Sequence, residues 1–276
     1  MSADAATLVA LASQLGEHAL PAFLTALAVS VAVAGATGLL VHRRRARSSD
    51  AEDITSRSLP RLAAAFTAGF ALIIGSALLF AEIAERLGQG NAMGLADQAL
   101  ADAIAVHTPE SALRAFALLT HLGDPVVLTL LGAAVAILLW RRRARLLAAG
   151  WLLALAGNAV LNPVLKGVFE RVRPLHDHGL AQATGFSFPS GHSSGAMVAY
   201  SMLLYVGLRL LPGRWHASIA MVAVALVLGI ACSRVFLRVH FASDVAAGLL
   251  SGLCWTGVCV AGLEFARHRQ ARRERT

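Results

Sequence analysis

Three short groups of residues in the second half of the chain have types and spacings suited to chemistry on an anion. The first runs from Lys166 to Arg173-Pro174, so that a lysine precedes an Arg-Pro pair by seven positions. The second is Pro189-Ser190-Gly191-His192, and the third runs from Ser233-Arg234 through His240 to Asp244. Each group lies next to an apolar stretch, which indicates that all three lie at a membrane boundary.

The cations of these groups suit a tetrahedral oxyanion. Arg173 and Arg234 can each grip two phosphate oxygens at once, and Lys166 adds a compact point charge. The turn at Ser190-Gly191 precedes an expected helix, so backbone N–H groups and the positive end of the helix dipole can point at the same anion. The pattern predicts a phosphate-binding site built without a metal.

Two histidines and one aspartate add reactive groups to this site. His240 and Asp244 are four residues apart, which on a helical turn places them on the same side. The carboxylate can then hold one ring nitrogen of His240 and leave the other free to attack. His192 comes from a different loop and can protonate a leaving oxygen, because an imidazole titrates close to working pH.

The composition indicates that a membrane holds these groups in place. Of the 276 residues, 57% are hydrophobic and 14% are charged, and the mean hydropathy is +0.65. Soluble chains average about 45–50% apolar and about 25% charged residues. The net charge of +8 comes in short arginine clusters that adjoin apolar runs, so we do not expect a nucleic-acid partner.

Apolar runs predict seven membrane-spanning helices, because about 20 apolar residues cross a hydrocarbon core of about 30 Å. The predicted spans are Ala19–His42, Leu62–Ala84, Pro125–Trp140, Leu146–Leu165, Ser194–Leu211, Ala217–Cys232 and Val245–Phe265. Asp124-Pro125 is typical of a helix start and predicts that the third span begins there. The stretch between the second and third spans, from Glu85 to Gly123, is typical of helices that lie at the membrane interface.

Charge predicts the orientation of the spans. Arginine clusters at 43–47, 141–145 and 267–275 each follow an odd-numbered span, and by the positive-inside rule they mark the cytoplasmic face. All three chemical groups then lie on the outer face. We expect three regions: a transmembrane helix with a basic linker (1–61), a six-helix core (62–266) and a basic cytoplasmic tail (267–276).

The three groups resemble the type 2 phosphatidic acid phosphatase (PAP2) superfamily, lipid phosphate phosphatases related to vanadium haloperoxidases. The resemblance rests on Lys-x6-Arg-Pro, Pro-Ser-Gly-His and Ser-Arg-x5-His-x3-Asp, which match at every defining position. It implies an all-α polytopic membrane bundle with six core helices. The span at Ala19–His42 is then an addition to that core.

The resemblance also implies roles for the matching residues. His240 is the nucleophile that forms a phosphohistidine, Asp244 orients it, and His192 is the acid for the leaving group. The phosphoryl group is bound by a wider set, namely Lys166, Arg173, Ser190, Gly191 and Arg234. The family uses no metal, and we expect no cofactor.

These features predict a multi-pass enzyme of the cell membrane, in a bacterium the inner membrane, with the active site on the extracytoplasmic side. The substrate class is a phosphate monoester or pyrophosphate of a lipid. Phosphatidic acid, phosphatidylglycerol phosphate and an isoprenyl pyrophosphate remain open, and so does the oligomeric state. Two other classes stay open: a non-enzymatic lipid-phosphate transporter or sensor, and an intramembrane serine hydrolase using Ser190, His240 and Asp244.

Two further predictions concern single cations. Lys166 is the one lysine among 24 basic residues and occupies the position where the motif has lysine, so we predict that Lys166→Arg is not silent. Arg171 and Arg238 do not belong to the motifs. We interpret both as anchors whose charged ends reach the membrane interface.

Overall fold

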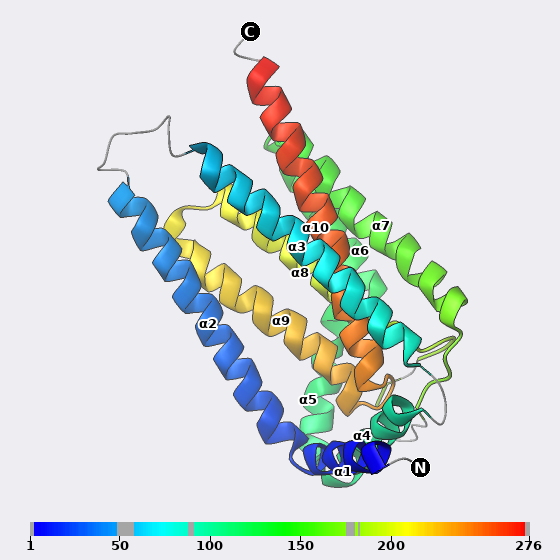
Figure 1. The fold of residues 1–276 in the computed structure, drawn as a ribbon. Helices are drawn as coiled ribbons and strands as arrows, with labels where there is room; N and C mark the ends of the chain where they lie inside the picture. Colours follow the sequence, from blue (N-terminus) through cyan, green and yellow to red (C-terminus); the bar gives the residue numbers. More distant parts are fainter. Residues whose placement is uncertain (1–2, 49–57, 88–90, 175–179, 182, 274–276) are drawn as a thin grey trace.

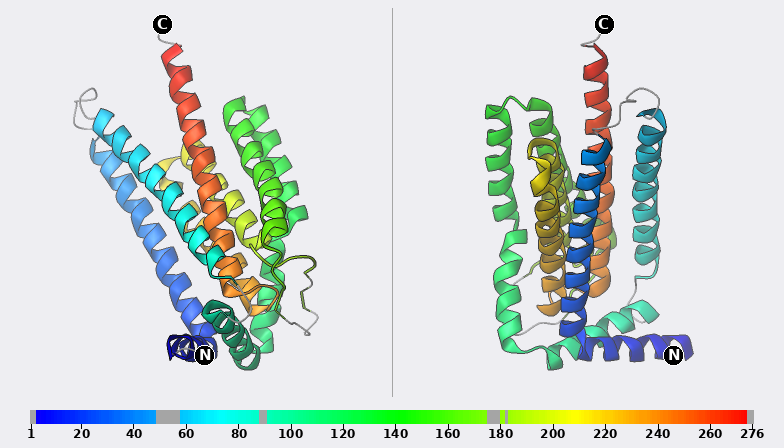
Figure 2. Two further views of the ribbon diagram at one scale, coloured as in Figure 1. Left: turned by 45° about the vertical axis from the view of Figure 1, so that its right-hand side comes forward. Right: turned by 90° about the vertical axis from the view of Figure 1, so that its left-hand side faces the viewer.

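The computed structural model describes residues 3–48, 58–87, 91–174, 180–181 and 183–273. They form long helices that run side by side, with α1 and α4 lying across one end of the bundle (Figures 1 and 2). The elements of the described residues are α1 (Ala3–Glu17), α2 (Ala19–Ser48), α3 (Ser58–Glu85), α4 (Ala92–His107), α5 (Glu110–Thr120), η1 (His121–Gly123), α6 (Pro125–Arg141), α7 (Arg145–Phe169), α8 (Gly191–Leu210), η2 (Gly213–Trp215), α9 (His216–Phe236) and α10 (Ala242–Arg273).

A helix forms at each of the seven predicted spans, so the predicted all-α membrane bundle is confirmed. Among the described residues, five stretches are long and apolar enough to cross a membrane; they contain α2, α3, α7, α9 and α10. A sixth qualifies only as a pair, in which α5 with η1 meets α6 at a bend of 45°. Helix α6, the third predicted span, begins at Pro125 as predicted, and α5 with η1 adjoins it across this bend.

Helix α8 is the predicted span that does not meet this test either by itself or in a pair. It packs against α6, α7, α9 and α10, and its buried residues include Ser193, Ser194 and Gly195. Because protein surrounds α8, small and polar side chains face other helices instead of lipid. Its mean hydropathy is therefore lower than that of the outer helices, although it occupies the middle of the bundle.

Close contact between α8 and α10 brings two of the predicted groups together. A Cβ atom at Gly252 would lie 2.8 Å from the carbonyl oxygen of Ser194, so glycine is needed for the helices to approach this closely. At the same end of the helices, the amide of Ser190 donates to the backbone oxygen of Asp244 over 3.0 Å. The start of α8 and the start of α10 are thus joined directly.

The predicted regions have more helix at their borders than expected. Helix α2 continues to Ser48 and α3 begins at Ser58, so both ends of the predicted basic linker are helical, and residues 49–57 lie outside the described part. Helix α10 continues to Arg273, so most of the predicted tail extends the last span. The helix ends that carry the arginine clusters lie opposite the ends that carry the chemical groups (Figure 1).

Candidate functional site

The three groups meet at one end of the bundle, although they lie far apart in the sequence (Figure 1). Lys166 is in the last turn of α7, and Arg234 is in the last turn of α9. His192 is in the first turn of α8, and Asp244 is in the first turn of α10. Helix ends and the connections between helices, not helix centres, therefore build the site.

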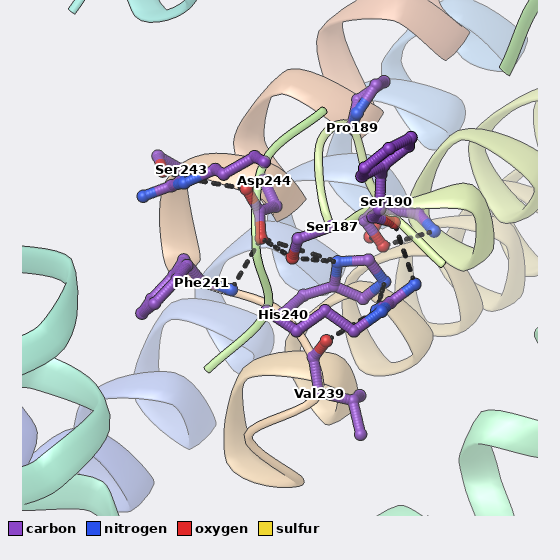
Figure 3. Close-up of polar contacts among 12 residues, drawn as sticks. Ser187, Pro189, Ser190, Val239, His240, Phe241, Ser243 and Asp244 are labelled. Atoms are coloured by element: carbon purple, nitrogen blue, oxygen red, sulfur yellow. Dashed lines mark hydrogen bonds and ion pairs between the residues drawn. The ribbon is translucent and has the colours of Figure 1, made fainter. Parts of the chain in front are cut away.

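His240 is held with one ring nitrogen turned inward. Its Nδ1 lies 3.3 Å from the hydroxyl of Ser187 and 3.5 Å from Oδ2 of Asp244 (Figure 3). Its Nε2 lies 3.0 Å from Nη1 of Arg173, which can only donate, so Nε2 accepts and the ring proton belongs on Nδ1. Burial lowers the pKa of His240; Asp244 opposes this shift and Arg173 adds to it. The imidazole is therefore neutral, with its lone pair on Nε2.

Asp244 is fully buried and bonded through both oxygens. Its Oδ2 accepts hydrogen bonds from the hydroxyl of Ser187 at 2.5 Å and from the amide of Phe241 at 2.9 Å. Its Oδ1 accepts from Nη1 of Arg171 at 2.6 Å. These bonds fix the carboxylate behind His240, on the side away from Nε2 (Figure 3).

The interpretation of Arg171 as an interfacial anchor was wrong. Its side chain is 13% exposed and forms ion pairs with Asp244 and with Asp97 of α4. Its position two residues before Arg173, a predicted site residue, was the available sequence signal.

Arg173 and Lys166 hold the loop beside His240. The guanidinium of Arg173 donates to four backbone oxygens, namely those of Thr184 at 3.1 Å, Gly185 at 2.9 Å, Phe186 at 3.0 Å and Val239 at 2.7 Å. Nζ of Lys166 donates to the same Phe186 oxygen over 2.5 Å. Two of the predicted cations therefore lie next to the reactive face of the imidazole.

Arg234 is the third predicted cation, and its side chain is only partly satisfied. It is 3% exposed, and its Nη1 donates to the hydroxyl of Thr120 over 2.8 Å. Its Nε is a buried donor for which the described residues supply no hydrogen-bond acceptor. Because leaving a buried donor unpaired costs about 1–3 kcal/mol, this nitrogen favours an incoming oxyanion.

His192 is bound to a carboxylate that the sequence suggested only as a helix start. Its Nε2 lies 2.8 Å from Oδ1 of Asp124, and Oδ2 of Asp124 lies 2.7 Å from Nδ1 of the exposed His121. Burial alone would raise the pKa of Asp124, but its two histidine partners hold that pKa below the usual range. Asp124 therefore remains charged. Burial, with the charge of Arg234, lowers the pKa of His192 to about 4, and Asp124 opposes this shift.

Of the two predicted phosphate-binding residues at the start of α8, Gly191 lines the pocket and Ser190 is buried beside it. Ser190 is fully buried, and its hydroxyl accepts from the amide of Ser193, which caps the start of α8. Its own amide is bonded to Asp244, so Ser190 contributes to the frame of the site. Gly191 faces the pocket, as do Lys166 and the other predicted cations.

A pocket of about 780 Å³ connects these groups to the apolar part of the bundle. Its polar end is lined by Lys166, Arg173, Gly191, His192, Arg234 and His240. Its apolar part follows α6 and α7 as far as Ala133 and Leu152, over a floor formed by Gly195 and Val198 of α8. Within the described chain, no cluster of three or more His, Cys, Asp or Glu side chains is arranged to hold a metal ion.

Fold and site together define an all-helical, multi-pass membrane protein with a cationic, histidine-bearing pocket at its helix ends. The family model described as the PAP2 superfamily matches residues 145–267, which contain all three groups. Over 165 residues, 56% of this chain and 82% of the relative, the chain is 33% identical to decaprenylphosphoryl-5-phosphoribose phosphatase of Mycobacterium tuberculosis. The chain belongs to the PAP2 superfamily, as its motifs predicted.

Two further comparisons concern Bacillus subtilis proteins. The chain is 38% identical to phosphatidylglycerophosphatase B over 105 residues, which are 37% of this chain and 51% of that protein, so the match spans about half the relative's length. A solved transmembrane PAP2-type phosphatidylglycerolphosphate phosphatase aligns with a TM-score of 0.63 and 28% identity. The alignment covers 70% of this chain and 96% of the solved one.

Proposed function

We propose that this protein is a membrane phosphatase that hydrolyses the phosphate monoester or pyrophosphate of a lipid through a phosphohistidine. The observation that carries the proposal is the pocket in which Nε2 of His240 lies beside Arg173, with Lys166 and Arg234 on the same wall. Phosphoryl transfer asks mainly for positioning and charge stabilisation, and these residues supply both. The named activities of the relatives support the same class of reaction.

In the first step the phosphoryl group enters among the three cations. The lone pair of His240 Nε2 attacks phosphorus and forms an N–P bond, while the bond from phosphorus to the lipid oxygen breaks. That oxygen takes a proton from His192, whose charged form is favoured by Asp124 and by the negative charge of the bound phosphoryl group. The proton on Nδ1 of His240 stays in place, and Asp244 stabilises the positive ring.

In the second step water replaces the lipid. The neutral His192 now accepts a proton from the attacking water, a new P–O bond forms, and the N–P bond breaks. Inorganic phosphate leaves, and both histidines return to their starting protonation states. Nη1 of Arg173 keeps its bond to the Val239 oxygen and turns its second N–H from Nε2 of His240 to a phosphate oxygen in both steps.

The apolar part of the pocket supports a lipid as the substrate. Its lining on α7 runs from Lys166 to Leu152, which at about 1.5 Å per residue is a length of about 21 Å. One leaflet contributes about half of a hydrocarbon core of about 30 Å. A hydrocarbon chain that follows α6 and α7 can therefore remain in the leaflet while its phosphate reaches His240.

We further propose that the site faces the extracytoplasmic side of a bacterial inner membrane, because the arginine clusters occupy the opposite helix ends. Residues 62–266 would form the catalytic core. Residues 1–61 and 267–276 would add a peripheral transmembrane helix and a basic extension. The outer helix α2 packs on α9, away from the pocket lining, which agrees with that division.

The test is phosphate release by the purified full-length protein across a panel of lipid phosphates and pyrophosphates in detergent. We expect activity that survives EDTA, is inhibited by vanadate and disappears in His240→Ala. Near-normal activity of His240→Ala would rule out this nucleophile. Single-turnover release of one phosphate per protein separates hydrolysis from the binding expected of a transporter or sensor.

The serine-hydrolase alternative has less support. The hydroxyl of Ser190 is fully buried and accepts from both the amide and the hydroxyl of Ser193, at 3.4 Å and 2.9 Å. The serine that contacts His240 is Ser187, on the Nδ1 side of the ring. Labelling of Ser190 by a fluorophosphonate would revive this alternative; we expect none.

A further inference from the structure

Behind Asp244 lies a buried group of charges that the three motifs do not include. Nη1 of Arg171 donates to Oδ1 of Asp244 and to the hydroxyl of Ser243, each over 2.6 Å. Its Nη2 donates to Oδ2 of Asp97 over 2.8 Å. The guanidinium also lies over the ring of Phe241, 4.5 Å from its centre. Arg171 thus contacts three residues that closely follow His240: Phe241, and Ser243 and Asp244 in the first turn of α10.

Asp97 attaches this group to α4. Its Oδ1 accepts from the amide of Ser243 over 3.2 Å, and its Oδ2 also accepts from the Ser243 hydroxyl. Asp97 is 7% exposed and shares the buried face of α4 with Ala101 and Ile104, at spacings of four and seven. Burying a carboxylate costs free energy unless it is paired. The presence of Asp97 on this buried face therefore needs a reason beyond packing.

Each carboxylate oxygen of Asp244 has a separate task. Oδ1 is bonded to Arg171, while Oδ2 faces Ser187 and His240. The donors to Oδ2, Ser187 and the amide of Phe241, hold one oxygen of the carboxylate. The bond of Arg171 to Oδ1 holds the other, which fixes the rotation of the carboxylate about its last bond and so the angle of Oδ2 to the imidazole. Arg171 is in turn prevented from turning by its second bond, to Asp97.

We propose that Asp97 and Arg171 are positioning residues for the His240–Asp244 pair. This inference rests on the proposed function and deepens it, because it adds α4 to the parts needed for catalysis. Neither residue faces the pocket, so neither touches the substrate. The residue pair acts by fixing the angle of Asp244 and by sharing one positive charge between two carboxylates.

The test compares Asp97→Asn, Arg171→Lys and the double variant with wild type, using the best substrate of the lipid panel. Asn keeps the shape of Asp97 but removes its charge, and the single ammonium of Lys cannot replace a fork that binds both carboxylates. We expect kcat to fall by about 10-fold to 100-fold in each variant, since small misplacements of reacting groups have effects of this size. KM should change less than twofold, because the phosphate-binding cations are unaltered.

The double variant and the pH profile separate positioning from folding. If the two residues act as one unit, the double variant loses no more activity than the worse single variant. In Asp97→Asn, the whole charge of Arg171 is paired with Asp244. The carboxylate of Asp244 then stabilises a protonated His240 less, so the pKa of His240 falls. His240 also faces Ser187, Arg173 and Arg234, which the substitution leaves in place. The acid limb of the profile of kcat/KM against pH therefore moves to lower pH.

The exposed ion pair between Arg114 and Glu110 of α5, 2.7 Å long, is the matched control. Glu110→Gln and Arg114→Lys make the same chemical changes, and we expect activity within twofold of wild type. Activity is expressed per folded protein, measured by size exclusion and thermal unfolding in the same detergent.

Three outcomes decide between the possibilities. Wild type without phosphate release contradicts the proposed function itself. An active wild type with an equally active Asp97→Asn overturns the positioning role alone. Loss of activity that follows only the folded fraction, with the pH profile unmoved, overturns it as well and makes the pair structural.

Discussion

Replacing Arg234 with methionine should make the ligand-free protein more stable and lower its activity about 10²-fold to 10³-fold. Methionine keeps an unbranched apolar stem but removes the charge and the unpaired Nε donor. If Arg234 serves only the packing of α9, its loss must weaken the bundle. If it is arranged to bind an anion, its loss removes a buried unpaired donor, so the protein without ligand should gain stability instead.

The magnitudes follow from its contacts. Removing a buried unpaired donor gains about 1–3 kcal/mol, while loss of the bond to Thr120 costs about 1 kcal/mol. The net gain of about 1 kcal/mol corresponds to a rise in Tm of about 2 °C for a chain of this size. Loss of one donor to a transition-state oxyanion lowers the rate by about 10²-fold to 10³-fold.

The assay measures Tm of the purified protein in detergent with and without vanadate, beside phosphate release. Vanadate at about 100 times its Kd should add about 2.7 kcal/mol to wild-type stability and nothing to Arg234→Met. Arg114→Met, on the exposed face of α5, is the control and should leave both readouts unchanged. A variant whose Tm falls by several degrees and still rises with vanadate would refute the reasoning.

Three other outcomes are expected. Lys166→Arg should lower kcat/KM about 10-fold, because the larger guanidinium must displace the loop at Phe186; equal kinetics would make the lone lysine a coincidence. Asp124→Asn should move the alkaline limb of the kcat profile to lower pH, since a protonated His192 loses its carboxylate; an unmoved limb contradicts that role. In wild type, burial lowers the pKa of His240, so kcat/KM should stay high below pH 6.5, and a fall that begins above this value contradicts a neutral nucleophile.

The order of the spans was predictable because a helix that crosses a membrane needs a long apolar run, and such runs are recognisable in the sequence. The exceptions have a common cause. Helix α8 is less apolar because other helices surround it, and α5, which adjoins α6 at a bend of 45°, packs on α9, where Phe116 stacks on Phe236. Contacts between helices, which hydropathy does not register, decided both.

The motif residues were also predictable, since Lys166, Arg173, Arg234 and His240 occupy positions defined by chemistry and spacing, and all four line the pocket. Their partners were harder to find. Asp97 is 147 residues before Asp244, on a helix that the motifs do not touch, and an aspartate on an apolar helical face was its only signal.

The sequence by itself determined the class of membrane protein, the helix ends that carry chemistry and the face they share, because these depend on local composition and short spacings. Tertiary structure decided which nitrogen of His240 is free, what holds Asp244, and that Arg171 is part of a buried charge group. Those properties depend on distances between residues far apart in the chain. Such distances exist only once α4, α7 and α10 are packed together.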